Sequence, residues 1–215
     1  MLIATGAITV NGKIVTELGT KIRPGDTVVY GKQKLVNEKK VYLLLNKPKD
    51  YITTSDDPQE RKTVLQIVQH ACRERIYPVG RLDRNTTGLL LLTNDGELTK
   101  RLTHPSHKVK KLYHVQLDRK VSKADMEKIA EGTMIDDSLV VPDQLAYAGT
   151  EGQKNEVGIE LHSGQNRVVR RIFEQYGYKV TRLDRVSFAG LTKKDLPRGK
   201  WRFLTEKEIN FLKML

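Results

Sequence analysis

The stretch "YPVGRLDRNTTGLLLLTNDG" (residues 77–96) joins a polar, glycine-flanked loop to a run of four leucines. The apolar run is typical of a core strand that is buried on both faces. Asp83 lies in the loop that leads into this strand. A core strand gives an exposed carboxylate a rigid support, which is the arrangement that a catalytic group requires. The loop is therefore a candidate catalytic site.

Two arginines beside Asp83 leave its role open on local sequence alone. Arg81 and Arg84 bracket the carboxylate, and a nearby guanidinium favours the ionised form. An ionised carboxylate can act as a nucleophile or as a base. The alternative is that Asp83 forms an Asx turn or an ion pair that only shapes the loop.

The same tetrapeptide, RLDR, occurs again at residues 182–185. Its neighbours in "YKVTRLDRVSF" are β-branched or aromatic, a composition that favours a strand. We expect Asp184 to pair with Arg182 or Arg185 on a sheet face, where such a pair contributes roughly a few tenths of a kcal/mol. This context indicates a structural carboxylate rather than a catalytic one.

Hydrophobic periodicity predicts the other elements of the main body. The expected strands are residues 41–48, 111–117 and 155–163, and the expected helices are 61–72, 122–132, 166–178 and one that begins with a Thr205–Glu208 capping box. In the helix at 166–178 the apolar residues fill one arc, and Arg167, Arg170 and Arg171 lie on the opposite arc.

Strands and helices mix along the chain without a regular βαβ rhythm. The sequence therefore predicts an α+β fold, in which helices flank a mixed, largely antiparallel sheet. The first residues have the pattern of a separate β-rich unit, because Asn11-Gly12 is a strong hairpin signal between two short apolar runs. The polar stretch at 31–40 is expected to be a linker. We predict a β-rich unit at 1–38 and a main domain at 39–215.

Charge and composition indicate a protein that binds polyanions. The 215-residue chain has 38 Lys+Arg against 26 Asp+Glu, a formal charge of +12, and residues 161–215 hold thirteen of the basic and five of the acidic residues. A clustered basic surplus favours nucleic acid, because each neutralised phosphate releases counterions; a solvated basic surface is the alternative. With one cysteine, Cys72, and no long apolar stretch, the chain is expected to be cytoplasmic and without an internal disulfide.

Further patterns concern ligands. His104 and His107 have H-x-x-H spacing, but no cysteine or carboxylate lies close in sequence to complete a metal site, so no metal is expected. The sequence has no glycine-rich phosphate loop, and no cofactor is expected. Tyr113 follows two lysines, which suits stacking on an unpaired base; the alternative is a core aromatic on a strand.

Together these motifs resemble a known family. "GRLDRNTTGLLLLTNDG" (80–96) is similar to the signature of pseudouridine synthases of the RsuA/RluB type, which modify ribosomal RNA. "LLLNKPKDYITT", "KKLYHVQL", "SGQNRVVRRIF" and "RGKWRFLT" resemble the other motifs of that family and follow in the same order. Residues 4–29 resemble the latter part of the small S-four-like RNA-binding module, from the tail of its second helix onward, so an incomplete module is expected.

The resemblance implies roles for individual residues. Asp83 falls on the family's catalytic aspartate, and Tyr113 falls on the tyrosine that stacks against the target base. Arg170 matches the basic residue that pairs with the aspartate, and Arg171, one position away, is the alternative. The other residues expected near the substrate are Arg81, Phe188 and Leu191.

The reaction implied by the resemblance is the isomerisation of a specific uridine in ribosomal RNA to pseudouridine, after the base has left its stack. The implied enzyme is a cofactor-free monomer that acts on ribosomal RNA, either free or within an assembling subunit. Two alternatives compete with this function. A non-catalytic RNA-binding or ribosome-assembly protein could retain the fold, and a nucleoside hydrolase would use a carboxylate but release the free base.

Overall fold

In the computed structural model the chain consists of two compact units, residues 1–39 and 40–215. The division lies one residue beyond the boundary expected from sequence. The residues whose structure is described are 2–23, 25–35, 38–55, 57–150 and 153–215. Within these ranges no helix combines the length and the apolar character that crossing a bilayer demands.

The described part of the smaller unit is an antiparallel sheet with the strand order β2-β1-β3-β4. Its strands are β1 (Ile8–Val10), β2 (Lys13–Val15), β3 (Val28–Tyr30) and β4 (Gln33–Leu35). The predicted hairpin is confirmed: Asn11 and Gly12 have φ values of 50° and 80°, and both positive angles are those that a type I′ turn requires. The linker predicted at 31–40 is wrong in part, because the chain turns at Gly31 and β4 pairs with β3.

The larger unit is built on one mixed sheet, with nine strands among the described residues. These strands are β5 (Tyr42–Lys47), β6 (Tyr77–Pro78), β7 (Thr87–Thr93), β8 (Lys111–Leu117), β11 (Gln144–Tyr147), β12 (Glu156–Leu161), β13 (Val180–Phe188), β14 (Leu191–Thr192) and β15 (Trp201–Phe203). A separate hairpin consists of β9 (Thr133–Ile135) and β10 (Ser138–Val140).

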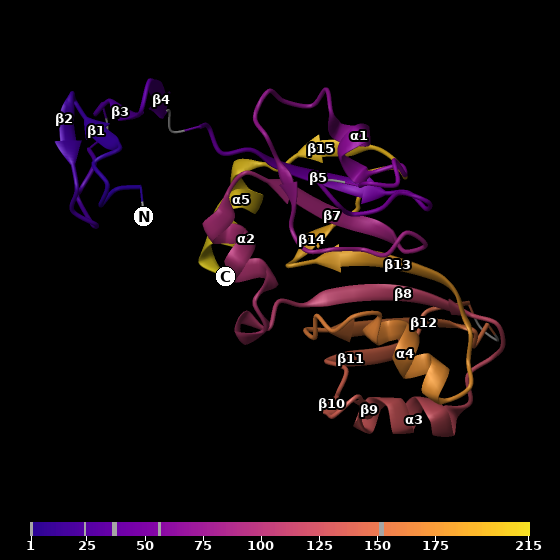
Figure 1. The fold of residues 1–215 in the computed structure, drawn as a ribbon. Helices are drawn as coiled ribbons and strands as arrows, with labels where there is room; N and C mark the ends of the chain where they lie inside the picture. The colour runs from indigo at the N-terminus through magenta and orange to yellow at the C-terminus, as the bar shows by residue number, and fades with distance from the viewer. Residues whose placement is uncertain (1, 24, 36–37, 56, 151–152) are drawn as a thin grey trace. The chain divides into compact units, whose positions relative to one another are not determined.

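The sheet has the order β11-β12-β8-β13-β7-β5-β15, and β13 therefore lies between β8 and β7 (Figure 1). Along this path β13 and β7 run parallel, whereas the other neighbouring strands of the described sheet are antiparallel. The α+β fold with a mixed, largely antiparallel sheet is thereby confirmed. The β7–β13 contact joins the part of the unit that precedes residue 94 to the part that follows residue 110.

The helices are α1 (Val64–Val68), α2 (Gly96–Thr103), α3 (Lys123–Glu131), α4 (Val168–Gln175) and α5 (Glu206–Met214). Ser122 caps α3, and Thr205 and Glu208 form a capping box on α5, as predicted. The helix expected at 61–72 is shorter than predicted, because a capping box at Thr63 starts α1. Figure 1 shows α3 and α4 alongside β11 and β12, with α2 and α5 at the other end of the sheet.

Leucines from β5 and β7 alternate between two hydrophobic cores, so these strands are buried on both faces, as predicted. Leu43, Leu45, Leu90 and Leu92 pack with α1 on one face, and Leu44, Leu89 and Leu91 pack with α2 and α5 on the other. A third core lies between α3, α4 and the strands β8, β12 and β13. Burial of apolar side chains on this scale is the main stabilising term of the fold.

Gly88 marks the closest approach between β7 and β13. It has a φ of +109°, and a Cβ atom at this position would lie 2.3 Å from the backbone oxygen of Arg185. Only glycine combines this φ with a backbone contact so close. The parallel register that pairs Gly88 with Arg185 therefore depends on the absence of a side chain.

Candidate active site

A cavity of about 180 Å³ opens beside the loop that carries Asp83. Its walls come from this loop, from β8, from the turn before α4 and from β13. The polar residues that line it include Arg81, Asp83, Lys111, Tyr113, Arg167 and Arg185. Pockets for drug-sized ligands measure about 300–1,000 Å³. The cavity therefore suits a single small ring rather than an extended ligand.

Asp83 stands between β6 and β7, in the loop that runs into the leucine strand. Its side chain is 37% exposed, and Oδ2 lies 3.5 Å from Nη1 of Arg167. Arg167 precedes the first turn of α4 and has a φ of 52°, so the periodicity of the helix does not set the direction of its side chain. Helical periodicity placed Arg167 only on the polar arc and could not predict that it would face Asp83.

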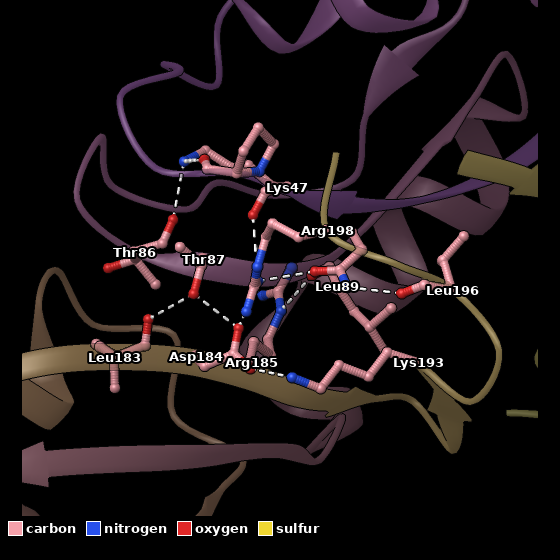
Figure 2. Close-up of polar contacts among 12 residues, drawn as sticks. Lys47, Thr86, Thr87, Leu89, Leu183, Asp184, Arg185, Lys193, Leu196 and Arg198 are labelled. Atoms are coloured by element: carbon pink, nitrogen blue, oxygen red, sulfur yellow. Dashed lines mark hydrogen bonds and ion pairs between the residues drawn. The ribbon is translucent and has the colours of Figure 1, made fainter. Parts of the chain in front are cut away.

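Lys47, the last residue of β5, anchors the backbone of the loop that carries Asp83 through hydrogen bonds from its ammonium group. Its side chain is fully buried, and Nζ donates to the carbonyl oxygen of Asp83 at 3.0 Å. Nζ also donates to the carbonyl oxygen of Thr86 at 2.8 Å (Figure 2). The same ammonium reaches the carbonyls of Pro48 and Arg84. Burial lowers the pKa of Lys47 to about 8, and the charge on Asp83 opposes that shift. Local sequence patterns did not single out Lys47 as a site residue, although a lysine at the end of a buried strand is an unusual feature.

Thr53 holds the loop from a second side. Its hydroxyl accepts a hydrogen bond from the backbone N–H of Leu82 at 3.3 Å and donates to the carbonyl of the same residue at 2.9 Å. Inside the loop, the N–H of Thr86 donates to the carbonyl of Asp83 at 3.0 Å. The backbone beside Asp83 is therefore tied at several points, while its carboxylate faces the cavity.

Tyr113 and Arg185 stand opposite each other on the paired strands β8 and β13. Arg185 is 3% exposed; its Nε donates to the carbonyl of Leu89 at 2.8 Å, and its guanidinium lies 4.6 Å from the ring centre of Phe188. Burial lowers the pKa of Arg185, and the phenol of Tyr113 opposes this shift. Tyr113 is partly buried and lines the cavity, so its ring is available to a ligand.

The other predicted site residues are dispersed. Arg170 was expected on the polar arc of its helix, but it is 8% exposed, and its Nη1 donates to the carbonyl of Val180 at 3.0 Å. Burial and the nearby Arg167 lower the pKa of Arg170, whereas Asp83 raises it. Arg171 forms an ion pair with Asp136, which lies in the turn between β9 and β10, and it is not among the residues that line the cavity.

Arg81 is exposed and lines the cavity, as does the buried ring of Phe188. Leu191 is buried in the core that it shares with Phe188, and it pairs with that residue across β13 and β14. The structure thus gathers Asp83, Tyr113 and Arg81 at one cavity and keeps Arg171 away from it.

Buried polar atoms without partners concentrate around the cavity. Among the described residues, four side chains carry such an atom: Thr86, Gln165, Arg170 and Arg185. Three of the four line the cavity. Buried polar groups in folded proteins are nearly always hydrogen-bonded, so walls with free donors and acceptors are typical of a site that binds a polar ligand.

Comparison with known proteins identifies the family. A profile described as RNA pseudouridylate synthase matches residues 41–175, and an S4 domain profile matches residues 1–28. The chain belongs to the RNA pseudouridylate synthase family. Ribosomal large subunit pseudouridine synthase B of Bacillus subtilis (strain 168) is 38% identical over 216 residues, which cover all of this chain and 88% of that protein.

An RNA pseudouridine synthase of Aquifex aeolicus (strain VF5) is 37% identical over 210 residues, covering 97% of this chain and 84% of the relative. A crystal structure of a pseudouridylate synthase superposes with a TM-score of 0.74 at 30% identity, covering 98% of this chain and 90% of that chain. The family and fold expected from the sequence motifs are thus confirmed.

In this pseudouridine synthase Asp184, in the second RLDR copy, is not among the residues that line the cavity, and its predicted partners were wrong. Asp184 accepts hydrogen bonds at 2.7 Å from both Thr87 and Arg198, and it also pairs with Lys193 (Figure 2). Arg182 is exposed, and Arg185 points into the cavity wall instead. The actual partners come from the turn after β14 and from β7, which local sequence could not reveal.

We expect Asp184→Asn to lower the stability of the protein in a pH-dependent way. Burial alone raises the pKa of Asp184, but hydrogen bonds from Arg198, Lys193 and Thr87 outweigh it and hold the pKa at about 2, below the ordinary 3.8. A carboxyl group whose pKa is lower in the folded than in the unfolded state stabilises the folded protein at pH values above the unfolded-state pKa. This stabilisation is lost as the pH falls through the folded-state pKa of about 2. The difference in the free energy of unfolding should be about 2 kcal/mol at pH 7.

Urea unfolding of both proteins between pH 7 and pH 2 measures this effect. The difference in the free energy of unfolding between wild type and Asp184→Asn should stay constant down to about pH 4 and then shrink toward zero. Glu127→Gln is the matched control, because its ion pair with Lys123 lies in solvent, and we expect it to leave stability unchanged. A gap for Asp184→Asn that is absent at pH 7, or that persists at pH 2, contradicts the prediction.

Proposed function

We propose that this protein isomerises a uridine of ribosomal RNA to pseudouridine and that Asp83 is the catalytic group. The observation that carries the proposal is the placement of Asp83: among the described residues that line the cavity it is the acidic one, surrounded by cations and Tyr113. Relatives that share the fold over nearly the whole chain are named for the large ribosomal subunit, which supports ribosomal RNA as the substrate. The proposed substrate is this RNA, free or within an assembling subunit, in the cytoplasm.

The isomerisation of uridine to pseudouridine can be carried out by correctly positioned side chains. The N1–C1′ bond breaks, the uracil rotates, C5 joins C1′, and the C5 proton is exchanged for one on N1. Atoms and electrons balance without an oxidant or an energy source. An ionised carboxylate can act as a nucleophile or as a base, and the Arg167 guanidinium at 3.5 Å favours the ionised form.

The target base must leave its stack before it can reach Asp83. Unstacking costs a few kcal/mol, and an aromatic wall repays part of it by stacking on the flipped base. We propose that Tyr113 forms this wall, because it lines the cavity beside Arg185. The exposed Arg81 and Arg167 at the same cavity are suited to hold the phosphates on either side of the flipped nucleotide.

Mapping products on unmodified ribosomal RNA tests the function. Purified protein is incubated with transcripts that cover both ribosomal RNAs, and pseudouridine is located by chemical derivatisation and primer extension. Pseudouridine at a defined position supports the proposal. Free uracil would identify a nucleoside hydrolase instead, and tight binding without any product would identify a binding protein.

Tyr113→Ala should lower turnover by about 100-fold or more, because the flipped base then loses a stacking surface of about 1–3 kcal/mol and its orientation in the cavity. RNA affinity should stay within a few-fold, since phosphate contacts supply most of it. Single-turnover rates and filter binding measure the two effects, and Tyr113→Phe should retain most of the rate.

Tyr77→Ala is the matched control for this prediction. Tyr77 is an exposed tyrosine on β6, and its ring contacts Arg75. We expect no change of rate or affinity in that variant. If Tyr113→Ala instead unfolds the protein, as judged by circular dichroism, Tyr113 is a core aromatic and its proposed role in stacking fails.

A further inference from the structure

Lys111 and Arg185 form a cationic pair on the inner wall of the cavity. Lys111 begins β8, and Arg185 lies on the neighbouring strand β13, beside Tyr113. Both residues line the cavity. Burial lowers the pKa of Lys111 to about 8; Arg185 adds to the shift, and Asp143 opposes it. The two charges therefore act on each other within a largely buried space.

Lys111 and Arg185 each have an N–H donor that is not used by the hydrogen bonds found within the described residues. The Nζ of Lys111 donates to the carbonyls of Val109 and His162, each at 2.9 Å, which uses two of the three N–H groups of an ammonium. The Nε of Arg185 is used by Leu89, but its buried Nη2 has no partner within the described residues. In the same residues neither side chain forms a salt bridge.

The charges of the cavity are out of balance. Arg81, Lys111, Arg167 and Arg185 line it, whereas Asp83 is the acidic residue among the described lining residues. Asp83 lies at 3.5 Å from Arg167, and no second acidic residue is among the described lining residues to pair with Lys111 or Arg185; Asp143, which acts on Lys111, is not among them. Burying charges without a counter-charge is costly, so such a pair indicates a site where negative charge appears during function.

We propose, resting on the proposed function, that Lys111 and Arg185 stabilise the negative charge that gathers on the carbonyl oxygens of uracil when the N1–C1′ bond breaks. The electron pair of that bond leaves with the base and spreads over N1, O2 and O4. The same anion then forms the C5–C1′ bond, after which C5 releases its proton and N1 takes one up. Donors aimed at a developing oxyanion stabilise it more than they stabilise the neutral base, and they thereby raise the rate.

The position of the pair favours the base over a phosphate as its ligand. Arg185 is almost wholly buried, and the same stretch of wall carries the apolar side chains of Val169, Leu183 and Phe188. A phosphodiester remains hydrated and meets cations at an exposed rim, which here means Arg81 and Arg167. A uracil ring can enter an apolar slot edge first and present its carbonyl oxygens to the two cations.

Lys111→Met tests the proposal, because methionine keeps the aliphatic stem and removes the charge. On an RNA that wild type modifies, we expect the single-turnover rate to fall by about 10²-fold or more, the size seen when one oxyanion donor is removed. RNA affinity should stay within about threefold, and the slope of affinity against salt should not change. Lys111→Arg should recover part of the rate, and Lys120→Met, at an exposed lysine beyond β8, should behave as wild type.

Thio-substituted RNA adds a test whose first part needs only the wild-type protein. Sulfur at position 2 or 4 of the target uracil is a weaker hydrogen-bond acceptor, so one substitution should slow wild type, and the loss should be smaller in Lys111→Met. Arg185→Lys, if circular dichroism shows it folded, should lose rate in the same way.

Two results would contradict the role of Lys111 and leave the proposed function intact. An unchanged single-turnover rate with a salt slope reduced by about one would make Lys111 a phosphate contact. A variant identical to wild type in all three measurements would give it no role. If wild type forms no pseudouridine on any ribosomal RNA transcript, the proposed function itself is wrong.

Discussion

Asp83→Asn is expected to abolish pseudouridine formation while leaving the fold and RNA binding intact. Asparagine has nearly the same shape but can act neither as a nucleophile nor as a base, so the single-turnover rate should fall by about 10⁴-fold or more, as when a nucleophile is removed from other enzymes. The side chain is 37% exposed, and its ion pair with Arg167 is 3.5 Å long. Such a partly solvated pair contributes little to stability.

Asp50→Asn provides the matched control. Asp50 lies beside the same loop, 55% exposed, and pairs with Arg84 at 3.4 Å. It carries the same charge beside the same loop and pairs with Arg84 instead of Arg167, but it is not among the residues that line the cavity. We expect the control to retain the wild-type rate, which would separate a loss of chemistry from a general loss of charge. Pseudouridine formed at equal rates by wild type and Asp83→Asn would refute the catalytic assignment.

Gly88→Ala should have the largest effect on the fold. The new methyl group would lie 2.3 Å from the carbonyl oxygen of Arg185 and 2.5 Å from its nitrogen, both backbone atoms that cannot rotate away. Alanine is also strained at a φ of +109°. Relief requires β7 and β13 to separate, at a cost that we expect to reach about 4 kcal/mol or more, a large part of the total stability of an ordinary domain.

Thermal unfolding followed by circular dichroism measures the effect of this substitution. We expect Gly88→Ala either to be insoluble or to melt more than about 10 °C below wild type. Gly96→Ala is the control, because Gly96 starts α2 and nothing lies within 4 Å of the Cβ position. Alanine is the better helix former, so the control should be neutral or slightly stabilised. A melting point for Gly88→Ala within 2 °C or so of wild type is incompatible with the close strand contact.

Local pattern sufficed for the strands β5, β7, β8, β12 and β13, for the caps of α3 and α5, and for the loop that carries Asp83. It did not predict the short strands β6, β9, β10, β11 and β14. The leucine run of β7 is continuous in sequence, and its burial on both faces follows from that run. The location of Tyr113 on a strand beside the cavity was likewise accessible, because alternation in 111–117 marks the strand. These features depend on neighbours within a few residues.

The missed features depend on contacts between distant segments. Lys47 reaches the carbonyl of Thr86, 39 residues away, only because β5 and β7 pair in the register that sets Lys47 opposite Gly88. The guanidinium of Arg167 faces Asp83 because its residue lies before the helix with a positive φ, a conformation that periodicity does not report. The partners of Asp184 lie in the turn after β14, whose path follows from the whole sheet.

The parallel contact between β7 and β13 also determines the stage of protein synthesis at which the cavity can form. It joins Thr87 to Asp184, 97 residues further along the chain. Contacts so distant in sequence form after local ones, since a large loop must close first. A growing chain that has emerged only as far as α4 already holds Asp83, Tyr113 and Arg167, but it lacks the strand that sets β7 and β8 at their working distance. The cavity therefore becomes complete only after β13 has been synthesised and has paired with β7 and β8.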